Sequence, residues 1–163
     1  MAENFKITEE MQSKVGWTSK PWKYEVTRTS VRAFARGVGY TDLVYYDVEA
    51  AKKAGYRDLP APPTYLGTPI FIPGQSDEYL PFPPDSAPSI DHGLPGLLDG
   101  GTETEYFDTL CAGDTLTCVN KLAGLLTKET KALGTMLIIS LEATYTNQDG
   151  KVVALQRSQV IHY

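Results

Sequence analysis

The C-terminal part of this chain is almost entirely strand-forming, and this feature constrains the fold most. Residues rich in β-branched and aromatic side chains recur between short turns. The four segments cover residues 102–110, 115–125, 135–145 and 152–161. The turn between the last two reads Asn-Gln-Asp-Gly, in which the glycine can adopt the positive φ that hairpins favour. The sequence therefore predicts consecutive antiparallel strands.

The N-terminal half has a different period. Residues 22–27 alternate bulky and polar side chains, which predicts a half-buried strand. A helix is predicted next, because four apolar side chains fall on one helical face. They are Val31, Phe34, Ala35 and Val38. Thr27 or Thr29 is the expected N-cap, and Gly39 suits the position after the helix. A second short helix is predicted from the N-cap Asp47 to Gly55.

Prolines shape the middle of the chain. Pro62 and Pro63 introduce an apolar segment, and we expect a short or kinked helix over residues 63–72. Residues 73–98 are too rich in proline for a long helix or a central strand, so a loop is predicted there. The segregated order predicts an α+β fold, with an antiparallel sheet wrapped around the helix at 63–72. We expect one domain over residues 1–163, residues 1–14 being a leader segment, and dimer formation through the sheet edges.

Composition narrows the function classes. The 163 residues carry a net charge of −5, which argues against nucleic acid as a partner. No apolar run approaches the roughly 18 residues that span a bilayer, and the N-terminus lacks the features of a signal peptide, so a cytoplasmic protein is predicted. Cys111 and Cys118 are expected to be buried thiols rather than a disulfide. With two histidines in the chain, no metal site is predicted.

Four segments in order carry a family resemblance. Residues 38–47 read Val-Gly-Tyr-Thr-Asp-Leu-Val-Tyr-Tyr-Asp, and residues 61–64 read Ala-Pro-Pro-Thr. Residues 98–107 with the Gly-Asp-Thr turn that follows, and residues 144–150, complete the set. Together they resemble the MaoC-type (R)-specific enoyl-CoA hydratase/dehydratase family, and most of all the N-terminal, non-catalytic half of double-hot-dog hydratases. The resemblance implies a single hot-dog fold and an acyl-CoA or acyl-carrier thioester as ligand, with no separate cofactor.

The reactive groups that the resemblance implies are replaced. Tyr40 and Tyr45 stand where the family has a catalytic Asp and His, and Pro63 stands where a backbone N–H holds the thioester oxygen. A phenol with a pKa of about 10 is a poor base at neutral pH, and proline has no amide hydrogen. Asp42 is the one carboxylate in this arm that can serve as a base, although a turn or cap residue is the plainer interpretation.

Candidate substrate contacts also come from the resemblance. Aromatic side chains that can line an acyl site, or simply pack in a core or an interface, are Tyr65, Phe71, Tyr79 and Phe82. Cations that can meet phosphates, or form a solvated helix face, are Lys52, Lys53 and Arg57. Asp108 and Cys111 stand at positions that are often basic in the family. His92 is interpreted as an exposed loop residue rather than a catalytic one.

Three functions remain open at this level. The favoured one is a thioester-binding subunit of an enoyl-CoA hydratase or 3-hydroxyacyl dehydratase, active only with an Asp/His-bearing homologous chain as a heterodimer. The alternative is a self-sufficient homodimeric hydratase that uses Asp42. Thioester hydrolysis ranks last, because residues 64–72 contain no Asp or Glu.

Overall fold

A single five-stranded antiparallel sheet organises the molecule. The computed structural model describes residues 5–67 and 85–163. The strands are β1 (Trp22–Glu25), β2 (Leu97–Tyr106), β3 (Thr115–Thr130), β4 (Gly134–Thr146) and β5 (Val152–His162). Their order across the sheet is β1-β3-β4-β5-β2, so β2 and the short β1 form the two edges. The predicted turn between β4 and β5 is confirmed: Gly150 has a φ of 78° and donates its N–H to the Asn147 carbonyl at 3.1 Å.

The two predicted helices form with the expected caps. In α2 (Arg28–Gly37), the Thr27 side chain accepts from the Ser30 N–H and the Ser30 side chain accepts in return from Thr27, a capping box. Gly39 follows with a φ of 81°, which only glycine adopts without strain. In α3 (Val48–Lys53), the Asp47 carboxylate accepts from the Ala50 N–H at 2.7 Å. Three shorter pieces are α1 (Glu9–Ser13), η1 (Leu43–Tyr45) and η2 (Tyr65–Gly67).

Several predicted boundaries are wrong. The strand expected over residues 115–125 continues to Thr130. The first long strand, expected over residues 102–110, runs from Leu97 to Tyr106. It starts earlier because Leu97 pairs with His162, and it ends earlier because the N–H groups of Phe107 and Asp108 both donate to the Val153 carbonyl. Of the helix expected over residues 63–72, the structure describes only the single 3₁₀ turn η2; residues 68–72 lie outside the described residues.

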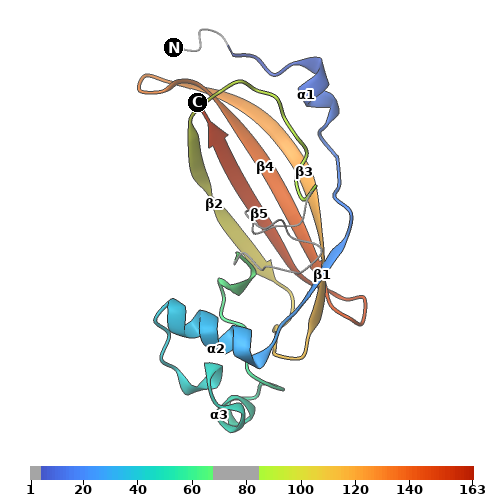
Figure 1. Cartoon of the computed structure of the whole chain (residues 1–163), viewed down its shortest axis with the longest axis vertical. Coiled ribbons are helices and arrows are strands. Elements are labelled where there is room, and N and C mark those ends of the chain that lie inside the picture. Colours follow the sequence, from blue (N-terminus) through green and yellow to red (C-terminus); the bar gives the residue numbers. More distant parts are fainter. Residues whose placement is uncertain (1–4, 68–84) are drawn as a thin grey trace.

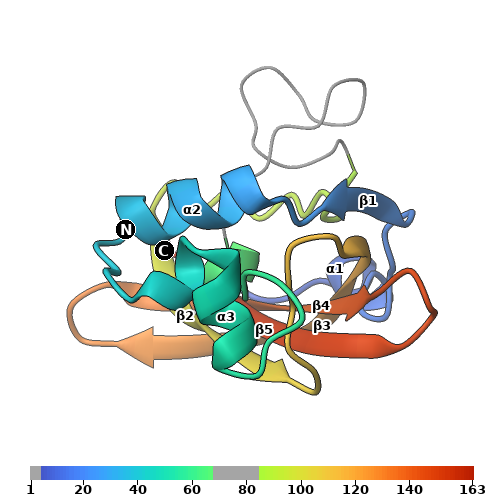
Figure 2. The ribbon, with the colours of Figure 1, turned by 90° about the horizontal axis from the view of Figure 1, so that it is seen from below.

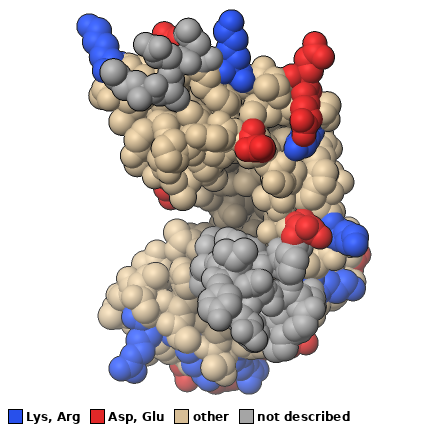
Figure 3. Space-filling view, turned by 45° about the horizontal axis from the view of Figure 1, so that its top comes forward, with Lys and Arg blue, Asp and Glu red and all other residues tan. Residues whose placement is uncertain are grey.

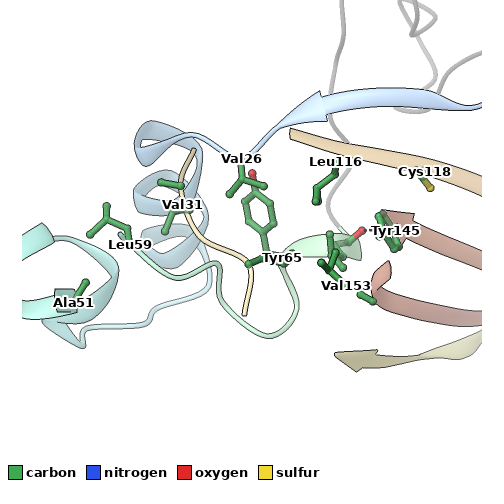
Figure 4. Close-up of a cluster of buried hydrophobic side chains, with 13 residues drawn as sticks. Val26, Val31, Ala51, Leu59, Tyr65, Leu116, Cys118, Tyr145 and Val153 are labelled. Carbon is green, nitrogen blue, oxygen red and sulfur yellow. Dashed lines mark hydrogen bonds between the residues drawn. The ribbon is translucent and has the colours of Figure 1, made fainter. Parts of the chain in front are cut away.

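The helices gather at one end of the sheet. Figure 1 places α2 and α3 beyond the end of β2, and Figure 2 shows that α2 is displaced to one side of the plane of the sheet. The larger core cluster lies between this helical layer and the adjoining strands. Its fully buried members include Val26, Val31, Leu59, Leu116 and Tyr145. Figure 4 shows the Tyr65 ring extending from η2 into this cluster, beside Val26 and Val31.

A second core cluster fills the other end of the sheet. It contains Leu94, Leu122, Leu137 and Ile139. A segment without regular structure covers it, and we call residues 85–94 the strap. Both ribbon views place the strap on the same side of the sheet as α2. The strap buries Leu94 and packs Ile90 against the cluster before the chain enters β2.

Candidate functional site

The arm between α2 and α3 is held by its own side chains. The Asp42 carboxylate accepts from the Val44 N–H at 3.1 Å and is the N-cap of η1. It is exposed to solvent. The Tyr46 hydroxyl donates to the Tyr40 carbonyl at 2.5 Å and closes the loop from the other side. Asp42 therefore has the geometry of a capping residue.

The two tyrosines at the family's reactive positions stack on each other. The rings of Tyr40 and Tyr45 lie 5.6 Å apart between centroids and 24° from parallel. Burial, followed by the proximity of Tyr40, Tyr56 and Asp42, raises the pKa of the Tyr45 phenol above its usual 10.0. A base for abstracting a proton near neutral pH needs the opposite shift. The stacked phenols therefore form an aromatic contact, and the raised pKa makes Tyr45 a poor base near neutral pH.

Pro63 lies in the turn that leads into η2. Its carbonyl accepts from the Tyr106 hydroxyl at 2.5 Å, while the next turn bond runs from the Tyr65 N–H to the Pro62 carbonyl at 2.9 Å. Burial raises the pKa of Tyr106 to about 12, so its hydroxyl stays a donor. Pro63 itself has no N–H to donate to an oxyanion, and the hydroxyl of the neighbouring Tyr106 already donates to the Pro63 carbonyl.

Tyr65, proposed as a wall of the acyl site, belongs to the core. Its side chain is 2% exposed and its ring packs edge-on against Phe34, with centroids 5.7 Å apart. Its hydroxyl lies 2.8 Å from the Ser30 hydroxyl on α2. The other three proposed wall residues, Phe71, Tyr79 and Phe82, lie outside the described residues.

The proposed cations are mostly committed to neighbouring acids. Lys52 forms an ion pair with Glu49 at 3.2 Å, one turn away on α3. Arg57 pairs with Asp114, whose side chain is 3% exposed, and also donates to the Thr109 carbonyl at 3.3 Å. Lys53 is exposed on α3. The arrangement matches a solvated helix face next to a structural ion pair.

Asp114 organises the turn that the family resemblance singled out. Besides pairing with Arg57, its carboxylate accepts from the Cys111 N–H at 2.9 Å. Nearby, Asp108 pairs with Lys151 at 2.7 Å, and this lysine lowers the pKa of the Asp108 carboxyl. The positions that are often basic in the family thus present a carboxylate and a buried thiol.

Both cysteines are free and buried, as predicted. Burial raises the pKa of Cys118 to about 12, so this thiol stays protonated and unreactive. Within residues 5–67 and 85–163, no three His, Cys, Asp or Glu side chains come together to hold a metal ion. No helix in the same residues has the length and apolar character needed to cross a bilayer.

Sequence reasoning missed one cavity. It measures about 380 Å³ on the face of the sheet that carries α2. Its walls are largely apolar, and they include Trp22, Leu66, Leu141, Ala143, Tyr145 and Val160. Alternation along β4 was the available signal, because residues 141, 143 and 145 share one face. The middle of the surface in Figure 3 is likewise hollowed and mostly uncharged.

A short polar chain crosses the floor of this cavity. Gln156 on β5 donates to the Thr104 hydroxyl at 3.0 Å and accepts from the Tyr145 hydroxyl at 3.3 Å. The Tyr145 hydroxyl is also 3.3 Å from the Leu66 carbonyl. Burial raises the pKa of Tyr145, so it remains a neutral donor. These groups can orient a polar ligand atom, but they supply no base.

One structural class accounts for a five-stranded antiparallel sheet with a short helical turn and an arm at one end: the hot-dog fold. Residues 13–156 match the family model described as FAS1-like, dehydratase domain region, and the chain belongs to this family of MaoC-like hot-dog dehydratases and hydratases. The α+β hot-dog prediction and the MaoC-like resemblance are therefore confirmed.

Three similar proteins illustrate the sequence identity and structural similarity that this chain shares with known proteins. A UPF0336 protein of Parafrankia sp. (strain EAN1pec) is 34% identical over 131 residues, or 80% of this chain and 79% of the relative. The HadBC (3R)-hydroxyacyl-ACP dehydratase complex of Mycobacterium tuberculosis contains a chain with a TM-score of 0.68 at 22% identity, covering 91% of this chain and 96% of that one. The ChsH1–ChsH2 complex of the same organism gives 0.72 at 19% identity, with coverages of 94% and 92%. The two structures establish likeness of fold.

Proposed function

We propose that this chain is the thioester-binding, non-catalytic subunit of a two-chain enoyl-CoA hydratase or 3-hydroxyacyl dehydratase that works in the cytoplasm. The proposal rests on the side-chain contacts within the arm between α2 and α3. Tyr40 and Tyr45 stack on each other, and the Asp42 carboxylate caps η1. Addition of water across a double bond needs a base and an acid at the substrate, and the arm presents neither.

The free edge of the sheet supports a partner chain. β2 pairs with β5 on one side and with no other described strand on its outer side. Leu97 is 64% exposed and Leu98 is 42% exposed on this edge. An unpaired edge with exposed leucines favours pairing with another sheet. The proposed partner is a second hot-dog chain that carries the Asp and His which this chain lacks. The HadBC and ChsH1–ChsH2 structures are themselves complexes of two different chains.

The ligand class follows from the family and the cavity. A largely apolar cavity of about 380 Å³ suits the acyl part of a thioester better than its phosphates. Arg57 is already paired with Asp114, and Asp108 adds negative charge near the family's basic positions. We therefore propose that this chain binds the acyl part of the thioester and that the partner supplies the catalytic groups. The proposal covers both CoA and carrier-protein thioesters.

The test compares the chain alone with the chain plus a MaoC-like homologue that bears the Asp and His. The chain alone is expected not to hydrate crotonyl-CoA or a longer enoyl-CoA. Mixed with the homologue, it is expected to form a discrete heteromeric complex that hydrates these substrates. Replacing the Asp of the partner by Asn should abolish hydration, whereas Asp42→Asn in this chain should leave it unchanged. Robust hydration by the isolated chain, lost in Asp42→Asn at unchanged stability, would establish the self-sufficient alternative instead.

A further inference from the structure

Two histidines from distant parts of the sequence meet where the strap joins the sheet. The His92 ring from the strap lies 3.9 Å, centroid to centroid, from the His162 ring at the end of β5, with the planes 40° apart. His92 was interpreted from the sequence as an exposed loop residue. That interpretation is wrong, because the strap folds back onto β5 and leaves His92 half-buried.

The unprotonated form of His92 is built into the strap. Its Nδ1 accepts from the Leu94 N–H at 3.1 Å, and an accepting nitrogen must carry a lone pair instead of a proton. Leu94 is 6% exposed and belongs to the second core cluster. The bond to the neutral ring therefore fixes the residue that the strap inserts into the core.

Both ends of the strap are tied independently of the histidines. At the first end, the Asn120 side chain donates to the Ser86 carbonyl at 2.8 Å. Just beyond the second end, the Gly96 N–H donates to the Tyr163 carbonyl at 2.8 Å. A Cβ on Gly96 would lie 2.6 Å from the Tyr163 ring, so a larger residue here would require that ring to move. The Lys14 ammonium also donates to the Ser89 carbonyl at 3.0 Å, so releasing Leu94 opens the strap between Ser89 and Gly96 and leaves it attached on both sides.

We infer that the pair His92–His162 is a pH-sensitive latch, which holds the strap closed over the second core cluster when His92 is neutral and releases Leu94 when His92 is protonated. Protonation of His92 at Nδ1 removes the acceptor for the Leu94 N–H. The charged His92 ring would then lie against the His162 ring and an otherwise uncharged cavity lining, with Asp91 as the neighbouring opposite charge. The inference does not rest on the proposed function, since neither ring belongs to the arm or lines the cavity beside Tyr145, although Ser86 and Ala87 of the strap line that cavity.

The charges that act on His92 are few. Burial, followed by the proximity of His162, lowers the pKa of His92 from its ordinary 6.5, and the neighbouring Asp91 opposes the shift. A cavity of about 230 Å³ lies beside the pair, between the strap and the sheet. Apart from the two histidines its lining is uncharged and consists of Ala87, Pro88, Ile90, Ile139, Leu141 and Val160.

The sign of the effect follows from linkage. A histidine whose pKa is lowered in the closed state favours the neutral form there, so the open state binds more protons. The closed strap therefore has its full stability above the ordinary pKa and loses stability as the pH falls through about 6.5. Opening uncovers Leu94 and the 230 Å³ cavity, so acidification should expose apolar surface at this end of the molecule only.

Amide hydrogen exchange on the full chain tests the latch. Between about pH 7.5 and about pH 5, on either side of the usual histidine pKa, the protection factor of the Leu94 amide should fall severalfold. Amides of the central strand β4 should keep theirs, which separates strap opening from global unfolding. In His92→Asn, the side-chain carbonyl can accept from the Leu94 N–H without titrating. In this variant, the protection factor of the Leu94 amide should be independent of pH.

If the strap of the His92→Asn variant stays open at every pH, the His162→Gln variant tests the latch instead. Removal of the His162 ring, whose proximity lowers the pKa of His92, should make the fall in Leu94 protection clearly smaller than in the wild-type chain. Equal Leu94 protection at both pH values in the wild type would overturn the latch. An undiminished fall in His162→Gln, or the wild-type fall in His92→Asn, would overturn it as well.

Discussion

The two ends of the sheet are closed in different ways. At the helical end, α2, α3 and η2 interlock over the first core cluster, and buried tyrosine hydroxyls find partners on neighbouring elements. At the other end, an irregular strap covers a smaller cluster, and the hydrogen bond that positions its buried leucine goes to an imidazole. Interlocked packing resists local opening, whereas a cover fixed at a few points opens without unfolding the rest. We therefore expect the helical end to share the global stability and the strap to open separately.

The largest effect is expected from Leu116→Ala in the first cluster. Leu116 is fully buried at the start of β3, so truncation leaves a cavity among elements that cannot easily move together. The free energy of unfolding should fall by about 3 kcal/mol, measured by urea denaturation with a single cooperative transition. A loss below about 1 kcal/mol would mean that this end is loosely packed, and the contrast between the two ends would disappear.

Leu94→Ala probes the strap in the same way and should cost less. Its side chain is as apolar as that of Leu116 and almost as buried, but the strap around it can collapse into the space. We expect a loss of about 2 kcal/mol in the free energy of unfolding. Amide protection should fall through the strap, while β4 amides change only in proportion to the global loss. A loss equal to that of Leu116→Ala, with uniform changes in exchange, would contradict a separately opening strap.

Tyr65→Phe should give the smallest effect of the three. It removes the hydroxyl that meets Ser30 and keeps the ring against Phe34, so about 1 kcal/mol of unfolding free energy should be lost. Tyr56→Phe is the matched control, because this tyrosine is 36% exposed, and its unfolding free energy should change within about 0.5 kcal/mol. Identical urea midpoints for the two variants would show that the Ser30 contact does not help to fix η2 on α2.

Local chemistry made much of the fold predictable. Thr27 and Asp47 are caps and Gly39 follows a helix, because a side-chain oxygen within reach of a free N–H, or a residue that tolerates positive φ, acts over a few positions. The hairpin at 147–150 follows the same logic. The strand at 97–106 was misplaced, because its start depends on pairing with β5, where Leu97 meets His162.

In the candidate site, too, some features were predictable from local chemistry and others were not. That Pro63 has no N–H, and that Tyr40 and Tyr45 are poor acids and bases at neutral pH, follows from residue identity alone. Residue identity does not reveal whether an aromatic side chain lines a cavity or fills a core. Tyr65 was a proposed wall residue and is buried against Phe34, whereas Tyr145 lines the cavity that sequence reasoning missed.

The amino-acid sequence by itself determined the period of each segment, the caps that end the helices, the family, and the absence of the usual catalytic groups from the arm. These properties depend on single residues or on neighbours a few positions apart. Only the tertiary structure decided that Arg57 is paired with Asp114 and that His92 meets His162. Both pairings join residues tens of positions apart. Which side chains become neighbours is set by how the sheet, helices and strap pack together.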